Sequence, residues 1–329
     1  MTHPETTDEL APLDTPSAGQ LARLRELADH ATDRAASAMA GNTGRAYDAQ
    51  WRRFAAWCSA HGLGALPADG RIVALYLASM DSEGLAVATM SQALAAIVKA
   101  HRKAELAPPS GRALEDTWAG IRRERGVAPS RKAPVTAEDL ARMVEVLAGD
   151  RLINVRDRAL LLVGFAGAFR RSELAALQVE DLSFEEGGVV VHLRRSKTDQ
   201  EGAGRDVGIP HQLGRGLHPV AALRTWLERS GITSGPVFRT VNQHGQLGTE
   251  PLAGNSIARI VKRAAMAVGL DPARFAGHSL RAGLVTSAAR AGKQLPAIMA
   301  QTGHRSVATV QGYIRRATLF EDNAATDLL

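Results

Sequence analysis

The chain has 329 residues, of which 45% are hydrophobic and 22% charged, and its formal net charge is +6. This composition excludes a disordered or membrane-embedded chain, and no apolar run approaches the roughly 18 residues that span a bilayer. Because the N-terminal sequence lacks the basic and then apolar order of a signal peptide, we expect a soluble protein in the cytoplasm. The single cysteine, Cys58, excludes an internal disulfide, and its setting in "FAAWCSAHG" predicts a buried packing residue.

The length of the chain predicts two domains, each large enough to bury a core. Residues 1–17 carry acidic side chains without Lys or Arg, and we expect them to form a disordered acidic tail. Residues 18–125 show helical periodicity throughout, which predicts a helical bundle. One helix is expected to begin at Gln20, and others are expected over 43–62, 71–80, 86–105 and 112–123. Prolines and a basic pair then predict a linker over 126–135.

Residues 136–329 are expected to form the second domain, which begins with helices over 137–148 and 156–177. The spacing of the apolar residues then changes from a helical to an alternating pattern, around Val191 and again around Val207. This alternation predicts a β-hairpin or a small antiparallel meander. Further helices are expected over 219–229, 256–268, 279–291, 295–301 and 307–314. The sequence therefore predicts a mainly α fold with a small antiparallel β-sheet (α+β).

The most basic stretch runs from Lys99 to Lys132 and holds nine basic residues against four acidic ones. A basic surface of this kind favours a polyanionic partner such as a nucleic acid. A solvated helix face explains the same charges equally well when they are considered alone.

Four short motifs in the second half place polar residues where apolar periodicity does not require them. They are Arg170-x-x-Glu173, Lys197 in a predicted turn, His278-x-x-Arg281, and the pair His304 and Tyr313. Each has an ordinary structural explanation: a surface ion pair, an exposed turn lysine, a capping turn, and an amphipathic helix with a hydrated tyrosine. Those explanations do not account for the joint occurrence of the motifs in this order.

Residues of these types suit the breaking of a phosphodiester bond. A tyrosine hydroxyl can attack phosphorus and keep the bond energy in a covalent phosphotyrosine, so that rejoining needs no ATP. Guanidinium groups stabilise the charge of the transition state, while a histidine can accept the tyrosine proton and a lysine can protonate the leaving oxygen. Because the chain has no carboxylate cluster or HExxH motif, we expect neither a metal nor another cofactor.

In order and spacing, this set resembles the signature of the tyrosine recombinase (phage integrase) family. From about Thr43 onward, stretches such as "GHSLRAG" and "TGHRSVATVQGYIR" are also similar to Cre-type members of that family. The resemblance implies that Arg170 and Arg281 clamp the scissile phosphate while Tyr313 attacks it. His278 would assist as base or hydrogen-bond partner, Lys197 would be the general acid, and Glu173 would orient its neighbours.

One position departs from Cre, and another allows a different register. His304 stands where Cre has a tryptophan, but histidine is usual in the wider family, so activity is still expected. Arg171 would be the clamp if the register slipped by one residue, although the spacing to Glu173 favours Arg170.

The resemblance also implies a core-binding helical domain and a catalytic domain that form a C-shaped clamp on double-stranded DNA. It further implies a homotetramer on two sites, joined through the C-terminal helix, whereas a helix packed on its own domain is the alternative. The candidate DNA-binding residues are Gln92, Lys99, Arg102, Lys103, Arg122, Arg123, Arg125, Arg131 and Lys132. Of these, Gln92 and Lys99 are candidates for contacts with bases. The competing functions are a type IB topoisomerase-like enzyme and a catalytically silent DNA-binding protein of the same fold.

Overall fold

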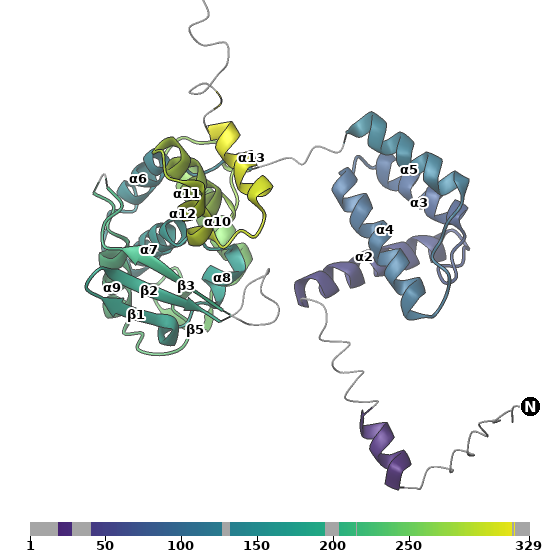
Figure 1. The fold of residues 1–329 in the computed structure, drawn as a ribbon, viewed down its shortest axis with the longest axis horizontal. Helices are drawn as coiled ribbons and strands as arrows, with labels where there is room; N and C mark the ends of the chain where they lie inside the picture. The colour runs from purple at the N-terminus through teal and green to yellow at the C-terminus, as the bar shows by residue number, and fades with distance from the viewer. Residues whose placement is uncertain are drawn as a thin grey trace, which may run out of the picture. The chain divides into compact units, whose positions relative to one another are not determined.

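The computed structural model describes residues 19–27, 41–126, 132–194, 204–214, 216–317 and 319. The chain divides into two compact units, Met1–Pro129 and Ser130–Leu329, and both are mainly helical (Figure 1). The predicted mainly α fold with a small antiparallel sheet is confirmed. The expected acidic tail, Arg131, Lys197 and nearly all of the segment that follows Ala317 lie outside the described residues. In the described part of the chain, no helix is long and apolar enough to cross a membrane.

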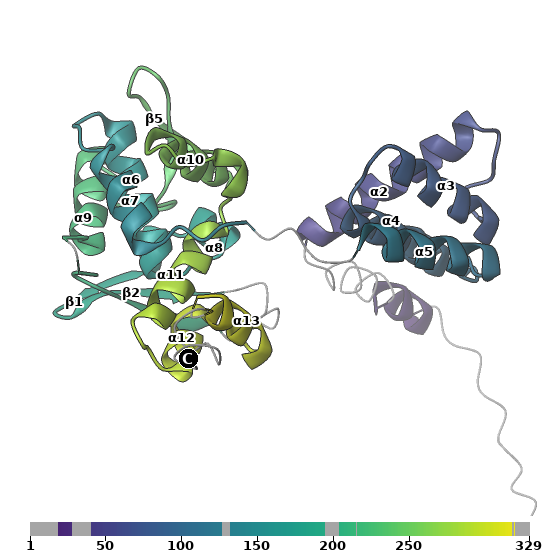
Figure 2. The same ribbon diagram turned by 90° about the horizontal axis from the view of Figure 1, so that it is seen from above.

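The first unit is a bundle of α2 (Gly41–Ala60), α3 (Gly70–Ser82), α4 (Val87–Lys103) and α5 (Arg112–Arg125), with a further short helix over residues 19–27. Helix α2 packs against α4, and α3 packs against α5 (Figure 2). Aromatic rings occupy the core: the Tyr76 ring centroid lies 5.1 Å from that of Phe54 and 5.3 Å from that of Trp57. Cys58 is buried beside them, as predicted, and this burial raises the pKa of its thiol.

The second unit surrounds α7 (Leu152–Ala166), which is buried along most of its length. The other helices of this unit are α6 (Ala137–Glu145), α8 (Arg171–Ala176), α9 (Pro219–Ser230), α10 (Gly254–Ala267), α11 (Ser279–Arg290), α12 (Leu295–Thr302) and α13 (Val307–Ala317). Two short 3-10 helices, Val179–Asp181 and Pro272–Arg274, connect longer elements. The apolar α7 therefore forms the centre against which the elements of the site are packed.

Strands β1 (Leu182–Glu185), β2 (Gly188–Leu193) and β3 (Arg205–Pro210) form an antiparallel meander in that order. Val191 pairs with Val207, and both side chains are buried, so the alternating apolar residues face the core as predicted. A second sheet of β4 (Arg239–Val241) and β5 (Leu247–Pro251) was not predicted. Its strands are short, and few of their residues are buried, which leaves little apolar alternation to detect.

The prediction of one helix over 156–177 was wrong, because the chain breaks after Ala166. The Cβ of any larger residue at Gly167 would lie 2.2 Å from the Phe169 ring, so the chain turns closely there. Ala168 then adopts a left-handed conformation with φ of 48°, which is unfavourable for a residue that carries a Cβ. Arg170 is consequently the extended N-cap residue of α8 and does not lie within a helix.

The segment that enters the second unit runs beside the start of α11. The backbone N–H of Ala133 donates to the Arg274 carbonyl at 2.7 Å, and that of Val135 donates to the Ser279 carbonyl at 2.9 Å. Gly283 permits this approach, because a Cβ at that position would lie 1.8 Å from the Val135 carbonyl oxygen. The entry segment and α11 are therefore fixed to each other.

Candidate active site

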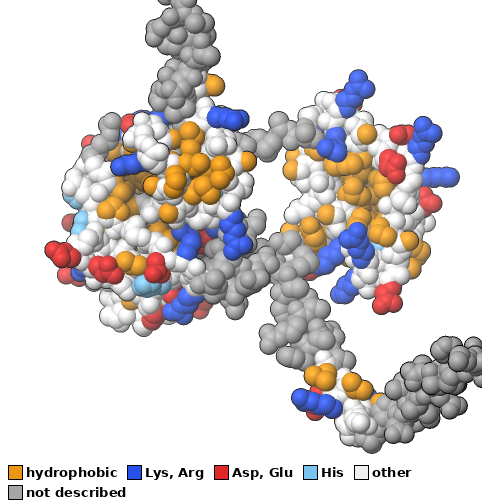
Figure 3. All heavy atoms as spheres, viewed as in Figure 1, with side chains coloured by type: hydrophobic (Ala, Val, Ile, Leu, Met, Phe, Trp, Pro, Cys, Tyr) orange, Lys and Arg blue, Asp and Glu red, His pale blue; other side chains and the backbone are white. Residues whose placement is uncertain are grey.

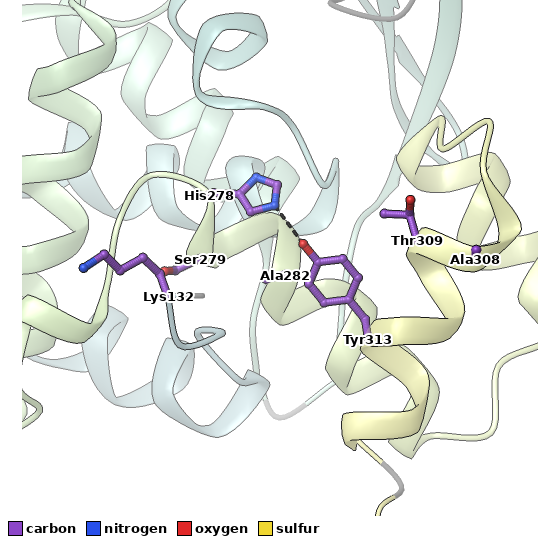
Figure 4. Close-up of a pocket in the computed structure, with 7 residues that line it drawn as sticks. All are labelled: Lys132, His278, Ser279, Ala282, Ala308, Thr309 and Tyr313. Carbon is purple, nitrogen blue, oxygen red and sulfur yellow. Dashed lines mark hydrogen bonds between the residues drawn. The ribbon is translucent and has the colours of Figure 1, made fainter. Parts of the chain in front are cut away.

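A pocket of about 540 Å³ opens between the start of α11 and helix α13 (Figure 4). Its lining residues are Lys132, His278, Ser279, Ala282, Ala308, Thr309 and Tyr313. Helix α13 is held against α11 and α12 by a small cluster that includes Val285, Ile298 and Val310, all buried. This packing fixes the position of Tyr313, whose ring lies at the edge of the same cluster.

The His278 ring and the Tyr313 hydroxyl point toward each other across the pocket (Figure 4). The Nε2 atom of His278 lies 3.0 Å from the hydroxyl oxygen of Tyr313, at hydrogen-bond distance. His278 keeps an exposed edge, but the surrounding protein removes part of its hydration. This desolvation, followed by the charges of Arg281 and Arg170, lowers the pKa of His278 below its ordinary value. The imidazole is therefore neutral at pH 7 and able to accept a proton.

Arg281 lies one turn further along α11 and is 1% exposed. Its Nη1 donates to the carbonyl oxygen of Ala168 at 2.8 Å, which anchors the guanidinium on the strained turn before α8. Its Nη2 is buried and has no hydrogen-bond partner among the described residues. Burial, then the charge of Arg170, lowers the pKa of Arg281 to about 10, so the group stays cationic at neutral pH.

Arg170 and Glu173 form a close ion pair at the start of α8. Arg170 Nη1 lies 2.6 Å from Glu173 Oε1, and the backbone N–H of Arg170 donates to Oε2 at 2.8 Å. The Glu173 side chain is only 2% exposed, so the carboxylate holds Arg170 from a buried position. Arg171 takes another direction, packs against Gly254 and Gly277, and donates to the Asn255 side chain at 3.2 Å. Of the two arginines, Arg170 is the one held by Glu173.

His304 follows α12 and lies near the same group of side chains. Its ring centroid is 6.4 Å from that of Tyr313, and its Nδ1 is 2.7 Å from the hydroxyl oxygen of Thr302. Because the Thr302 hydroxyl donates to the Ile298 carbonyl at 2.7 Å, it accepts from His304, which places the imidazole proton on Nδ1. Burial, then Arg281 and Arg170, lowers the pKa of His304 to about 4, so this ring is also neutral.

Sequence reasoning missed Arg205, the first residue of β3. Its Nη1 donates to the Gln301 carbonyl at 3.1 Å, and its Nη2 lies 4.0 Å from Glu173 Oε2. Its charge also contributes to the low pKa values of Arg281 and His304. No motif marked this arginine, since a basic residue at the start of a strand is ordinary. The predicted site residues that the structure describes lie with Arg205 in one cluster of interacting side chains: Arg170, Glu173, His278, Arg281, His304 and Tyr313.

The candidate DNA-binding residues of the first unit lie on α4 and α5. Lys99 sits over the Tyr47 ring at 5.7 Å, and Lys99 and Lys103 line a hollow of about 380 Å³ with Tyr47 and Trp51. Gln92 is half-buried on the same helix, and Arg102 is exposed. Figure 3 shows Lys and Arg side chains at several separate places on the visible face of this unit.

The candidates on α5 and at the entry to the second unit differ in availability. Arg122 lies over the Trp118 ring at 5.9 Å and Arg123 is exposed, whereas Arg125 is paired with Asp81 at 2.7 Å. Lys132 reaches the candidate pocket, and its ammonium donates to the Ala273 carbonyl at 2.8 Å. Arg125 is therefore the least available of these cations.

Comparison with known proteins identifies the family. Residues 134–319, more than half of the chain, match the phage integrase family. The chain belongs to the phage integrase family. It is 37% identical over 289 residues to an integrase/recombinase XerD homolog of Selenomonas ruminantium, a match that covers 87% of this chain and 84% of the relative. It is also 29% identical over 283 residues to the recombinase Cre of Escherichia phage P1, covering 80% and 81% of the two chains. The integrase is therefore a tyrosine-type DNA recombinase, as the sequence motifs predicted.

Solved structures of other recombinases share the fold of this integrase. The XerH site-specific recombinase bound to a palindromic difH substrate matches with a TM-score of 0.56 at 21% identity, covering 78% of this chain and 70% of that one. A lambda integrase dimer bound to a core site matches with a TM-score of 0.58 at 17% identity, covering 88% and 93% of the two chains. Both matches extend over more of this integrase than its second unit alone.

Proposed function

We propose that this integrase is a site-specific recombinase that cuts and rejoins duplex DNA through a 3′-phosphotyrosine on Tyr313, without ATP or a metal. The observation that carries the proposal is the 3.0 Å contact between the Tyr313 hydroxyl and a neutral His278, with Arg281 and Arg170 close enough to lower the pKa of His278. A nucleophile and a base in one pocket, with two guanidinium groups nearby, are what phosphoryl transfer to tyrosine needs.

The cleavage step follows from these positions. In the tautomer with its proton on Nδ1, His278 accepts the Tyr313 proton at Nε2 as the tyrosine oxygen attacks phosphorus. The bond from phosphorus to the 5′ oxygen breaks, the 3′ phosphate remains on the tyrosine, and Lys197, outside the described residues, protonates the departing oxygen. Arg170 and Arg281 stabilise the negative charge of the transition state, while Glu173 orients Arg170. His304, with its proton held on Nδ1 by Thr302, would border the phosphate as a neutral ring.

The first unit would hold the DNA through the basic side chains of α4 and α5. Lys99 and Lys103 beside aromatic rings, together with Arg102, Arg122 and Arg123, would contact phosphates and set affinity more than sequence preference. Among the structural neighbours, XerH and the lambda integrase dimer are bound to DNA, which supports a DNA site as the partner. We further propose a homotetramer on two sites, assembled through the segment after Ala317, in the cytoplasm where such DNA is found.

A type IB topoisomerase-like enzyme would use the same chemistry but would not exchange strands between two sites. The similarity to XerD-like and Cre recombinases covers at least 80% of this chain, and this favours strand exchange. A catalytically silent DNA-binding protein would not need the nucleophile. The hydrogen bond between His278 and Tyr313 favours an active enzyme.

Covalent capture tests the proposal. Wild-type and Tyr313→Phe protein would be incubated with sheared DNA from the native host, denatured, and stripped of unattached DNA before the remainder is sequenced. Tyr76→Phe is a matched control, because the Tyr76 hydroxyl is buried without a hydrogen-bond partner among the described residues and lies in the other unit. We expect wild type and Tyr76→Phe to retain the same DNA sequence and Tyr313→Phe to retain none.

Two outcomes would contradict the proposal. If wild type binds DNA in a native gel but retains none after denaturation, the protein is a silent binder under these conditions. If Tyr313→Phe loses DNA binding together with attachment, the hydroxyl has a structural role. Recombination of two captured sites on one plasmid would then separate a recombinase from a topoisomerase, which would relax supercoils without exchanging the sites.

A further inference from the structure

Arg205 occupies a place between two parts of the site that come from distant stretches of the chain. Its Nη1 donates to the Gln301 carbonyl at 3.1 Å, next to the turn that leads to His304. Its Nη2 lies 4.0 Å from Glu173 Oε2, the atom that accepts the backbone N–H of Arg170. The side chain is 20% exposed, so most of these contacts are shielded from water.

Each of the two contacts leads directly to a predicted catalytic group. Glu173 Oε1 holds the guanidinium of Arg170 at 2.6 Å. On the other side, the Gln301 side-chain amide donates to the Ala166 carbonyl at 2.8 Å and to the Gly208 carbonyl at 3.0 Å. The next residue, Thr302, accepts the bond from His304. Arg205 therefore connects the carboxylate that holds Arg170 with the segment that holds His304.

The turn before His304 is shaped around the Arg205 side chain. Gly303 has φ of +64°, and a Cβ at this position would lie 2.7 Å from Arg205 Nε. Both its left-handed backbone and this close approach favour glycine. The guanidinium thus packs on the backbone of the turn, and its buried Nε and Nη2 have no hydrogen-bond partner among the described residues.

Buried N–H groups of a cation are costly when they have no acceptor, so their presence needs a reason. Arg205 contributes positive charge to the group that contains Arg170 and Arg281, and Glu173 is the carboxylate that faces all three. The local excess of positive charge suits an anionic phosphoryl group that gains negative charge in the transition state. If the residue served packing alone, an apolar side chain would fill the place without the free energy needed to bury a charge.

We propose that Arg205 is a positioning residue of the recombinase site, which holds Glu173 and Arg170 in register with His304 and adds a third guanidinium charge behind the phosphate. The proposal rests on the function proposed above, because it assigns Arg205 to the same cleavage reaction. In this proposal Arg205 acts through its contacts with Glu173 and the Gln301 backbone. The proposal predicts that loss of Arg205 lowers the rate of cleavage and leaves the affinity for DNA unchanged.

The test compares two variants. Arg205→Gln removes both the positive charge and the planar set of guanidinium N–H donors, whereas Arg205→Lys keeps the charge alone. Arg158→Gln is the matched control, because Arg158 is also partly buried and donates to two backbone carbonyls, of Leu147 and Gly149, away from the site. Single-turnover attachment to the duplex found by covalent capture is measured at saturating protein, together with the dissociation constant of the DNA complex and the thermal midpoint.

We expect Arg205→Gln to slow attachment about 100-fold, the loss that a misplacement of about 1 Å produces in a catalytic site. Arg205→Lys should cleave about tenfold faster than Arg205→Gln, since lysine restores the charge but not the guanidinium donors that contact both Glu173 and Gln301. The dissociation constant should change by less than about twofold, and Arg158→Gln should cleave at the wild-type rate. An unchanged rate in Arg205→Gln, or a loss of rate that Arg158→Gln reproduces, would overturn the proposal.

A second measurement does not depend on cleavage. The ring nitrogen resonances of His304, observed by NMR in the protein without DNA, report its bond to Thr302 and its surroundings. We expect Arg205→Gln to shift them and Arg158→Gln to leave them in place. If wild type never attaches to DNA but the shift is seen, the proposed chemistry fails while the positioning role stands. If the resonances do not move, the positioning role fails whatever the rates show.

Discussion

The hydroxyl oxygen of Tyr313 lies 3.0 Å from Nε2 of His278, across the packing interface between α13 and α11. The two residues are 35 positions apart in the chain. Their contact depends on the apolar cluster beneath them, which holds the two helices together before any DNA is bound. Under the proposed mechanism, the proton acceptor is therefore already in place when the phosphate arrives.

The rate of cleavage should respond to pH as a neutral His278 requires. Since burial, Arg281 and Arg170 lower its pKa, the base form persists at pH values where an ordinary histidine, with a pKa of about 6.5, would be half protonated. We expect the acidic decline of the rate to be centred below pH 6.5. His278→Gln should slow cleavage by about 100-fold or more and abolish this acidic decline.

A rate profile measured on single-turnover attachment decides this point. His211→Gln is a suitable control, because His211 is exposed and bonds the Glu186 carbonyl at 3.0 Å on the far end of β3. A decline centred at or above pH 6.5, or one that survives in His278→Gln, would show that another group causes the loss of rate at low pH.

Glu173→Gln should destabilise the protein far more than the same change in an exposed ion pair. The amide removes the negative charge that faces Arg170 in a site where the carboxylate is 2% exposed, and we expect a loss of about 3 kcal/mol in the free energy of unfolding. Glu83→Gln is the matched control, since Glu83 also lies 2.6 Å from an arginine nitrogen, that of Arg53, but is 50% exposed.

For Glu83→Gln we expect a loss below about 1 kcal/mol, because water screens that pair. Denaturant unfolding of the three proteins gives both values. Equal losses in the two variants would show that the burial of Glu173 does not determine the strength of its interaction.

Lys197→Ala should slow cleavage by about 100-fold or more if this residue protonates the leaving oxygen. A duplex with a sulfur atom in place of the 5′ oxygen should restore much of the rate, because a thiolate leaves without an acid. Lys262→Ala, which changes an exposed lysine of α10, should behave as wild type on both substrates. No recovery with the sulfur substrate would remove Lys197 from this role.

Removal of the residues after Ala317 should weaken assembly on two DNA sites more than binding to one. The expected reason is that this segment docks on a neighbouring subunit. Native gels with one-site and two-site duplexes measure both effects, and removal of residues 1–17 serves as a control of similar size. An equal loss on the two duplexes would contradict docking between subunits.

The helices and the three-stranded meander could be predicted because apolar spacing reports burial along a regular element. The break after Ala166 could not, since it depends on Gly167 meeting Phe169 and on the left-handed Ala168, which the apolar pattern does not reveal. The shared chemistry of the candidate site residues was enough to name them from the sequence, and the structure brings those that it describes together. Arg205 could not be named in this way, because its contacts with Gln301 and Glu173 form only on folding. The division into a tail, two domains and a linker, and the roles of Lys197 and Arg131, stay predictions.

The attachment of the entry segment to α11 has a practical meaning for the construction of chimeric recombinases. Lys132, Ala133 and Val135 are bonded to Ala273, Arg274 and Ser279, so this stretch belongs mechanically to the second unit, and Lys132 lines the pocket beside His278. A junction that grafts a foreign DNA-binding unit onto this enzyme should therefore be placed before Lys132. A graft that replaces this short stretch would exchange part of the lining of the candidate active site together with the first unit.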